Sequence, residues 1–256
     1  MLNNSIKHQV KLLLFFLIFP AFLFAQDADN KNIKDENGKK QGYWEERNGK
    51  NTAKGNYIDN RKVGQWVTIS PKEYVVRVEN YENGLLEGYV VKMDQRGYVK
   101  KLIQYKEGAK HGIDILYTFG GRTEEKRNYK EGLLEGEVRL YYDNGNPKET
   151  GFYKEGKREG ITKWYDYDGN AIAEYQYVNG ELHGLQKAFY PSGELLSEDT
   201  YENNVQVGEH KEYHKNGNPK MMGGYKDGKK DGKWILYDTS GNETTTQIYK
   251  AGQLKK

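Results

Sequence analysis

The chain contains no cysteine among its 256 residues and only five prolines. Without cysteine the protein can form neither disulfides nor thiolate metal sites. Hydrophobic residues make up 36% of the sequence and charged residues 30%, so it is poorer in aliphatic side chains than a compact two-layer domain of this size normally is. Such a composition is also typical of disordered chains, but the regular spacing of the 22 tyrosines argues for an ordered structure.

An excess of one charge is also missing. The chain has 40 Lys and Arg against 37 Asp and Glu, and the two signs are interspersed. A surface that neutralises phosphates usually needs a clustered basic excess. We therefore expect no nucleic acid partner.

One apolar run stands near the N-terminus, from Leu12 to Ala25. Its 14 residues are fewer than the roughly 18 that a membrane-spanning helix needs. Lys7 and Lys11 precede the run, and a small residue ends it. These features predict a signal peptide over residues 1–25, cleaved after Ala25; an uncleaved anchor is the alternative. The expected location is periplasmic, outer-membrane-associated or extracellular, in a bacterium.

What the sequence does contain is a repeat of 24 residues. Tyrosine recurs at this interval nine times without a slip, at Tyr57, Tyr81, Tyr105, Tyr129, Tyr153, Tyr177, Tyr201, Tyr225 and Tyr249. A fixed period in this range marks an architecture in which one small unit is copied and stacked. We number the columns of each copy from this tyrosine, which is column 1. Repetition along the whole array leaves no room for a catalytic domain, so we expect a protein that is not an enzyme.

Glycine defines three further columns. Column 8 is glycine in all eight full copies, at Gly64, Gly88, Gly112, Gly136, Gly160, Gly184, Gly208 and Gly232. Column 4 is Gly or Asn in every copy, and column 17 is Gly in all full copies except the first, which has Glu73. Glycine and asparagine tolerate the left-handed backbone that tight hairpin turns require. Columns 4 and 17 therefore predict two turns in each copy.

The stretches between the turns are 5–8 residues long and rich in aromatic and β-branched residues, which is typical of strands. Several glycines in every copy disfavour a helix. Each copy should form two strands. The predicted fold class is all-β, an elongated antiparallel meander of repeated β-hairpins that makes a largely single-layer, curled sheet.

The chain divides accordingly into a signal peptide, a linker and a repeat array. We assign residues 1–25 to the signal peptide, 26–34 to a short linker and 35–256 to the array. Within the array, residues 35–56 form an atypical first copy, 57–248 the full copies and 249–256 a partial copy. An atypical end copy is expected of a cap.

Column 13 is a second aromatic row, which consists of Tyr117, Tyr141, Tyr165, Phe189, Tyr213 and Tyr237. Columns 9, 11 and 13 share one strand face because alternate residues point the same way, and only column 13 is consistently apolar. Neighbouring side chains of such a row stabilise a sheet by roughly 0.2–1 kcal/mol per pair. We expect a structural row, with a stacking surface for a glycan or peptide as the alternative.

No catalytic or metal-binding arrangement stands out. His111 and His183 lie three copies apart, and His210 and His214 share a strand face at a separation of roughly 13 Å, which is too far for one metal ion. The glycines do not form a phosphate loop, because that motif needs a helix. We therefore assign no catalytic residue, no metal and no cofactor.

The unit Y-x-x-G-x-x-x-G, followed by an aromatic residue and a second glycine, resembles the MORN repeat family and, more closely, its bacterial variant. The resemblance covers Asp35 to Lys256. It implies an elongated β-hairpin array that acts as a binding or scaffolding module, and some bacterial members are described as antitoxin-like.

A second resemblance concerns KWYDYDGN, from Lys163 to Asn170, which is similar to the choline-binding cell-wall repeats. Those repeats pair Trp and Tyr before an acidic turn, and a ladder of choline cages would need its tryptophans in register. Trp66 and Trp234 stand in column 10, whereas Trp164 stands in column 12.

The resulting hypothesis is an exported, non-enzymatic repeat protein that acts as a binding or scaffold module for a protein or envelope partner. The alternative is an aromatic-ladder binder of glycans or lipid headgroups in the cell envelope, so contact with a membrane or a glycan stays open.

Overall fold

The computed structural model describes residues 31–256, and all of the regular structure in this range is β. These residues form 23 strands that pair antiparallel, and they contain no helix. No helix that could cross a membrane therefore occurs in this part of the chain. The predicted all-β meander of hairpins is confirmed. The predicted signal peptide and the start of the predicted linker lie outside the described residues.

The strands fall into two compact units. Unit 1 comprises residues 31–109 and Tyr117–Gly121, and unit 2 comprises Lys110–Leu116 and Arg122–Lys256. Unit 1 holds β1 (Ile33–Lys34), β2 (Lys40–Asn48), β3 (Asn51–Ile58), β4 (Arg61–Ile69), β5 (Val75–Glu82), β6 (Leu85–Leu86), β7 (Gly88–Met93) and β8 (Val99–Lys106). Strand β9 (Ala109–Tyr117) supplies residues to both units.

Unit 2 contains the remaining strands. They are β10 (Thr123–Lys130), β11 (Leu133–Leu134), β12 (Gly136–Tyr141), β13 (Pro147–Lys154), β14 (Lys157–Tyr165), β15 (Ala171–Val178), β16 (Glu181–Leu182), β17 (Gly184–Phe189), β18 (Leu195–Glu202), β19 (Val205–Tyr213), β20 (Pro219–Lys226), β21 (Lys229–Tyr237), β22 (Glu243–Lys250) and β23 (Gln253–Leu254).

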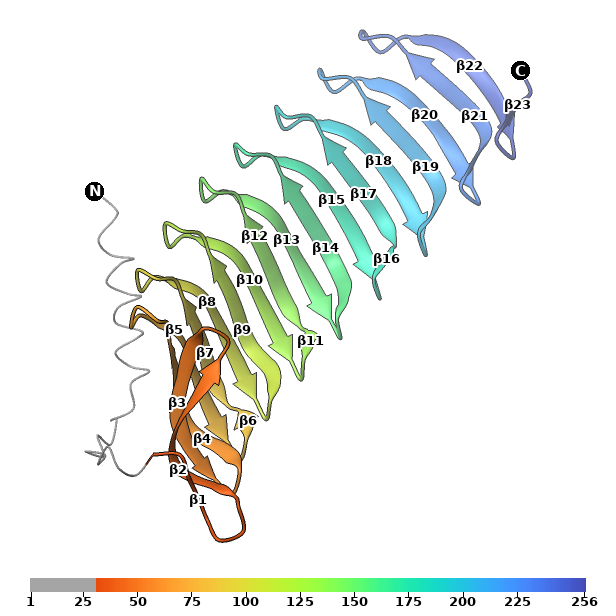
Figure 1. The fold of residues 1–256 in the computed structure, drawn as a ribbon. Helices are drawn as coiled ribbons and strands as arrows, with labels where there is room; N and C mark the ends of the chain where they lie inside the picture. The colour runs from red at the N-terminus through yellow and green to blue at the C-terminus, as the bar shows by residue number, and fades with distance from the viewer. Residues whose placement is uncertain (1–30) are drawn as a thin grey trace. The chain divides into compact units, whose positions relative to one another are not determined.

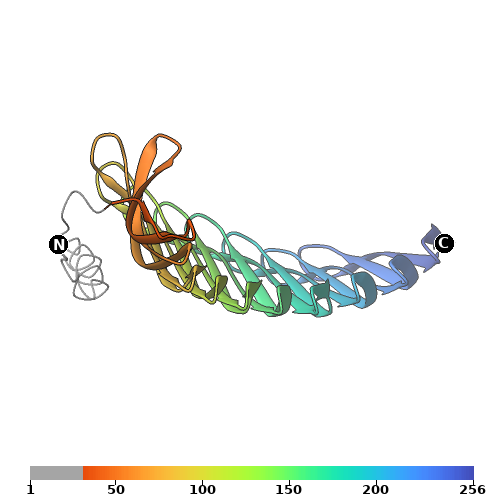
Figure 2. The ribbon, with the colours of Figure 1, turned by 60° about the horizontal axis from the view of Figure 1, so that its bottom comes forward.

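Strands pair with their neighbours along the chain. In unit 2, β12 pairs with β13, β13 with β14 and β14 with β15. Figures 1 and 2 show the green-to-blue hairpins of this unit following one another, and no further described strand or helix covers either face. Burial in such a sheet must come from side chains of adjacent strands that cover one another.

The turn at columns 3 and 4 contains two residues. Lys154 pairs with Lys157 around Glu155 and Gly156, whose φ angles are 51° and 82°. Positive φ at both central residues is the pattern of a type I′ turn, whose twist suits the strands that it joins. The left-handed backbone predicted for column 4 is therefore confirmed.

The turn that ends at column 17 contains three residues. In one example the Asp166 N–H donates to Asn170 O at 2.9 Å, and the Gly169 N–H donates to Asp166 O at 3.1 Å. Gly169 has a φ of 93°, which confirms the left-handed backbone predicted for column 17. Glu73 keeps the same conformation with a φ of 62°, although a non-glycine residue is strained there.

Columns 8 and 1 are partners across neighbouring strands. Column-8 glycines lie opposite the tyrosine of the next copy, as Gly64 does with Tyr81. The same pairing joins Gly42–Tyr57, Gly88–Tyr105, Gly136–Tyr153, Gly160–Tyr177, Gly184–Tyr201, Gly208–Tyr225 and Gly232–Tyr249. The two most regular columns of the sequence thus form one cross-strand pair.

The two-residue turns are tied to the preceding copy by backbone hydrogen bonds. The column-4 N–H donates to the column-6 carbonyl one copy earlier, as Gly156 does to Leu134 at 2.9 Å. Where asparagine stands in column 4, its side chain adds a second bond. The Leu182 N–H donates to Asn204 Oδ1 at 2.8 Å, while the Asn204 N–H donates to Leu182 O at 3.0 Å. The column-6 backbone is therefore held in place.

Three copies have an interrupted strand. The sequence pattern predicted two continuous strands in each copy and not this break. Strands β6, β11 and β16 end at column 6, and the next strand begins at column 8. The column-7 residue between them still bonds to the neighbouring strand, since the Glu135 N–H donates to Asn128 O at 2.9 Å. The break is therefore a local irregularity in an otherwise paired strand.

Column 10 is the most buried row of the sheet. Trp66, Val90, Val138, Thr162 and Trp234 in this column are at most 3% exposed. The side chains of Trp66, Thr162 and Trp234 pack on a glycine in column 23 of the preceding copy. A Cβ on Gly55 would lie 2.4 Å from the Trp66 ring, and a Cβ on Gly223 would lie 2.1 Å from the Trp234 ring. A tryptophan in column 10 therefore requires glycine in column 23.

Substitution of Gly223 by alanine tests this packing. The Trp234 indole cannot move away easily, because it is buried and its Nε1 donates to Gly224 O at 3.2 Å. We expect Gly223→Ala to lower the free energy of unfolding by about 1–3 kcal/mol in urea denaturation. Gly120→Ala is the matched control, since its Cβ would meet only Thr118 Oγ1 at 4.0 Å. Equal losses in both variants would contradict the tight packing.

Candidate binding face

One face of the sheet carries columns 1, 6, 10 and 23, and we call it the tyrosine face. Gly64 lies opposite Tyr81, and Trp66 lies opposite Glu79 on the same two strands. Directly opposed residues share a face, as do alternate residues along a strand. Columns 9, 11 and 13 consequently lie on the opposite face.

In unit 1 the tyrosine face is a row of rings packed edge to face. The ring centroids of Trp44 and Tyr57 are 5.7 Å apart, those of Tyr57 and Trp66 5.1 Å, and those of Trp66 and Tyr81 6.4 Å. Such pairs contribute roughly 0.5–1.5 kcal/mol each beyond the burial of their area. Together with Ala53, these rings form a hydrophobic cluster of the unit.

Two lysines of column 6 lie over these rings. Lys40 Nζ is 4.5 Å from the centroids of both Trp44 and Tyr57, and Lys62 Nζ is 3.9 Å from the centroid of Trp66. A cation at this distance is attracted by the negative face of the ring. The aliphatic parts of the lysines thus cover the rings, and their charges stay on the tyrosine face.

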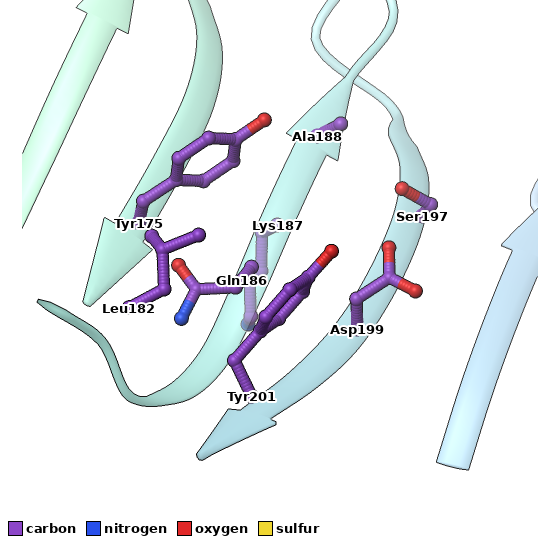
Figure 3. A pocket seen from close by; sticks show the side chains of 8 residues that line it. All are labelled: Tyr175, Leu182, Gln186, Lys187, Ala188, Ser197, Asp199 and Tyr201. Atoms are coloured by element: carbon purple, nitrogen blue, oxygen red, sulfur yellow. The ribbon is translucent and has the colours of Figure 1, made fainter. Parts of the chain in front are cut away.

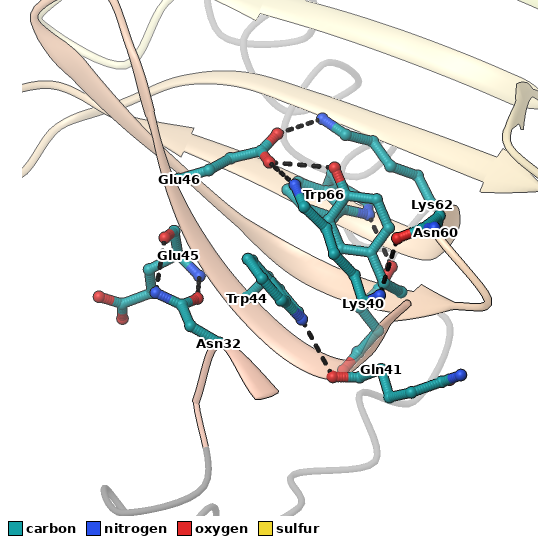
Figure 4. A network of polar contacts seen from close by, with 11 residues as sticks. Asn32, Lys40, Gln41, Trp44, Glu45, Glu46, Asn60, Lys62 and Trp66 are labelled. Carbon is teal, nitrogen blue, oxygen red and sulfur yellow. Dashed lines mark hydrogen bonds and ion pairs between the residues drawn. The ribbon is translucent and has the colours of Figure 1, made fainter. Parts of the chain in front are cut away.

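Glu46 joins the two lysines, as Figure 4 shows. Its Oε1 lies 2.8 Å from Lys62 Nζ, its Oε2 lies 3.3 Å from Lys40 Nζ, and the Tyr57 hydroxyl donates to Oε2 at 3.0 Å. Burial alone would raise the pKa of Glu46, but the hydrogen bonds from Lys62 and Tyr57 outweigh it and lower that pKa. Burial and the bond to Glu46 raise the pKa of Tyr57. The carboxylate is charged and the phenol neutral at neutral pH.

Arg158 takes the column-6 place in the middle of unit 2. Its guanidinium carbon lies 5.3 Å from the ring centroid of Tyr153 and 5.6 Å from that of Tyr177. Its Nη1 lies 2.7 Å from Glu149 Oε1. The arginine therefore stands between two successive column-1 rings and is neutralised by a carboxylate of the preceding strand.

Near the C-terminal end of unit 2, Trp234 is the centre of a similar cluster. Its ring lies edge to face with Tyr225 at 5.2 Å and with Tyr249 at 6.1 Å. Lys230 Nζ lies 4.0 Å from the Trp234 centroid, and His210 stacks on the indole at 5.4 Å with 28° between the planes. The pattern of unit 1 thus recurs with different side chains.

His210 occupies column 10 and pairs with a carboxylate in column 23. Its Nδ1 lies 2.6 Å from Asp199 Oδ1, and Gln206 Nε2 donates to the same oxygen at 2.5 Å. The residues in columns 10 and 23 therefore vary together, both in size and in charge. The pairs are Trp with Gly in two copies and His with Asp in another.

A small cavity opens on the tyrosine face beside Leu182, as Figure 3 shows. Its volume is about 80 Å³, and its lining includes Tyr175, Leu182, Gln186, Asp199 and Tyr201. In the figure the rings of Tyr175 and Tyr201 stand on either side of Gln186, and the Asp199 carboxylate lies beside Tyr201. The cavity combines aromatic walls with the Asp199 carboxylate, and its lining also includes Lys187, whose Nζ lies 3.6 Å from Glu198 Oε1.

The aromatic residues singled out in the sequence do not gather on one face. Column 1 lies on the tyrosine face, whereas column 13 lies half-buried on the opposite face. There the Tyr213 hydroxyl donates to Glu198 Oε2 at 3.2 Å, and the Tyr165 hydroxyl lies 3.4 Å from Thr150 Oγ1. The sequence pattern did not reveal the roles of columns 6 and 23, although the sequence contains the two tryptophans in column 10 and the column-23 glycines on which they pack.

The histidines are placed separately. His210 packs on Trp234, while His214 Nε2 lies 3.1 Å from Tyr237 O near the three-residue turn. No group of three His, Asp or Glu side chains that could hold a metal ion occurs in residues 31–256.

These features define a class, the β-hairpin repeat proteins, whose surface is assembled from the side chains of successive copies. A family model described as MORN repeat variant matches residues 134–155, 158–179, 182–203 and 206–227. Residues 134–227 therefore contain four tandem copies of the MORN repeat variant, each of which begins at column 6. MORN repeats in general form binding or scaffolding modules and are not catalytic. Among curated proteins, none matches the chain significantly.

The ion network of Glu46 predicts a dependence of stability on pH. The folded-state pKa of Glu46 lies below its ordinary value of 4.5, so its charged form stabilises the fold above that pH. This stabilisation is lost as the pH falls through the folded-state pKa. We expect Glu46→Gln to cost about 1 kcal/mol at neutral pH and to remove part of the acid-induced loss in melts from about pH 7 to about pH 3.

Glu209→Gln is the control for this variant. Its side chain is 79% exposed in a pair with Lys211, and exposed pairs contribute little. A pH profile of Glu46→Gln that matches both the wild type and Glu209→Gln would contradict a stabilising role of Glu46.

Proposed function

We propose that the chain is an exported, non-enzymatic binding module whose tyrosine face takes up a protein partner of the cell envelope. One observation carries the proposal: a constant backbone frame presents side chains that change from copy to copy on a single face. Column 6 is Lys or Arg in five places, column 10 ranges from Trp to Asp, and column 23 from Gly to Tyr. Such a surface can be specific for a partner while every copy keeps the same fold.

The proposal is supported by the chemistry of the tyrosine face. Tyrosine, tryptophan and arginine are the residues enriched at the centres of protein–protein interfaces. Here Arg158, Trp164 and Tyr177 lie together, since the guanidinium carbon is 5.5 Å from the ring centroid of Trp164 and 5.6 Å from that of Tyr177. The rings are already ordered by their neighbours, so binding would immobilise few of them.

Export is supported by the N-terminal sequence alone. If residues 1–25 are a signal peptide, protein recovered from the native host begins at Gln26, which N-terminal sequencing measures. Ala25→Arg should leave the precursor uncleaved, because signal peptidases require a small residue there. Ala28→Arg lies beyond the cleavage site and should be processed. Recovery of the wild type with Met1 in place would contradict export by cleavage.

The partner can be sought by mild crosslinking in the native host, followed by affinity capture and mass spectrometry. We expect one protein to be retained well above the level seen with an unrelated bait. Retention should survive substitutions on the opposite face, such as Lys233→Ala at a half-exposed side chain. Turnover of a substrate by the pure protein would contradict the non-enzymatic assignment.

The second candidate function is an aromatic-ladder binder of glycans or lipid headgroups. It is favoured by the half-buried rings of column 13, which lie on a face that no described element covers. In this case, leucine at Tyr141, Tyr165 and Tyr213 would abolish binding to peptidoglycan, polysaccharide or anionic vesicles and leave the fold intact. Unfolding of the same variant would indicate that column 13 is structural.

A further inference from the structure

Most cations of column 6 share a common setting. Lys40 and Lys62 lie over rings and bind Glu46, Lys110 lies over Tyr129 and binds Asp114, and Arg158 lies over Tyr153 and Tyr177 and binds Glu149. The distances from cation to ring centroid run from 3.9 Å for Lys62 to 5.6 Å for Arg158. The fold thus repeatedly places a cation between an aromatic ring and a carboxylate.

Leu182 is an exception, because it stands where the cation would be, while aromatic rings and a carboxylate are present around it. It stands in column 6 of its copy, where it carries no charge, and the cavity of about 80 Å³ lies beside it. The walls are Tyr175 and Tyr201, and Asp199 supplies the carboxylate. Both hydrogen bonds that Asp199 accepts, from Gln206 and at His210 Nδ1, use Oδ1, so Oδ2 can accept another donor.

Leu134 provides a comparison within unit 2, because it stands in the same column and in the same kind of two-residue strand. The next tyrosine after Leu134 is Tyr153, and the guanidinium carbon of Arg158 lies 5.3 Å from its ring centroid. Burial raises the pKa of Tyr153, and the charge of Arg158 acts against that rise. The next tyrosine after Leu182 is Tyr201. Burial first, and then the negative charge of Asp199, raise its pKa. A cation therefore lies beside the ring that follows Leu134, whereas the ring that follows Leu182 lies beside the Asp199 carboxylate. Lys187 also lines this cavity, but it stands in column 11 and pairs with Glu198.

The size of the cavity limits what it can hold. A volume of about 80 Å³ exceeds the ~10–15 Å³ that a single water needs. It is far below the roughly 300–1,000 Å³ of pockets that enclose a whole small molecule. It therefore suits the head group at the end of a longer chain.

We propose that the cavity between Tyr175, Tyr201 and Asp199 receives the guanidinium or ammonium group of an Arg or Lys side chain from a protein partner. The incoming cation takes the place that Lys or Arg of column 6 fills in other copies. Its charge meets Asp199 Oδ2, and its plane or methylene groups lie against the tyrosine rings. The inference rests on the proposed function, since it assigns the chemistry by which the partner is recognised.

The experiment uses the full mature chain and a fluorescent nonapeptide, Gly-Ser-Arg repeated three times, with binding measured by fluorescence anisotropy. The same peptide with citrulline in place of arginine should bind about tenfold more weakly. Leu182→Lys supplies the missing cation from within the chain and should weaken binding of the arginine peptide about tenfold. Leu134→Lys places the same residue in the matched position and should change binding less than about twofold.

Asp199→Asn is the second variant, in case Leu182→Lys fails to fold, and it should also weaken binding about tenfold. Equal affinity for the arginine and citrulline peptides, or no effect of any substitution at the cavity, overturns the proposal. Binding of free tetramethylammonium as tight as that of the peptide overturns the assignment to a partner's side chain.

The capture experiment separates this inference from the proposed function. A partner that is retained equally by the wild type and by Leu182→Lys leaves the proposed function in place and overturns the cation site. Loss of that partner in Leu182→Lys, but not in Leu134→Lys, supports both.

Discussion

The pairing of column-8 glycines with the tyrosine of the next copy is the constraint on which the rest of the structure depends. The glycines of this column have φ angles between 63° and 91°, a region that other residues enter only with strain. The space beside most of them is open, so it is the backbone conformation and not crowding that requires glycine. The opposite residue is tyrosine in the pairs of Gly64, Gly88, Gly136, Gly160, Gly184, Gly208 and Gly232, and the tyrosine ring supplies the apolar area that glycine lacks. A slip of one residue would place the ring row on the other face.

Once this register is fixed, the remaining columns can change together. Column 10 lies on column 23 of the preceding copy, so the two must share one volume. Trp66 over Gly55 and Trp234 over Gly223 place the large residue on one strand, whereas Gln186 beside Tyr175 places it on the other. In the pair of His210 and Asp199, the two columns match in charge as well as in size. The buried row is therefore not uniform, because the frame only demands that the two contributions fit.

The sequence predicted the frame better than the surface. Columns 4 and 17 were recognised as turns because left-handed backbone restricts the residue type, and this restriction is visible in the letters alone. Column 13 was recognised as a second aromatic row for a similar reason, since its residue is Tyr or Phe in six of the eight full copies. Column 10 is more deeply buried but looks irregular, because Thr162 and Gln186 stand in line with Trp66 and Trp234. Their compensation in column 23 appears only when strands of different copies are paired.

The candidate site could not be predicted from the sequence either, because it too depends on contacts between strands of different copies. The cations of column 6 look like solvated charges in the sequence, where Lys and Arg alternate with Leu. In the structure the backbone of column 6 is bound by the following turn, so each of these side chains has a fixed place over the rings. A charged side chain that is held in this way is part of the packing. Its replacement by leucine therefore changes both the packing and the charge of the surface. Around Leu182 the rings and a carboxylate are present without the cation. Groups that contact a cation of the chain itself in other copies are therefore left open to a partner. A repeat protein can acquire specificity by this route without any change to its frame, because the complementary group is one that the fold already uses.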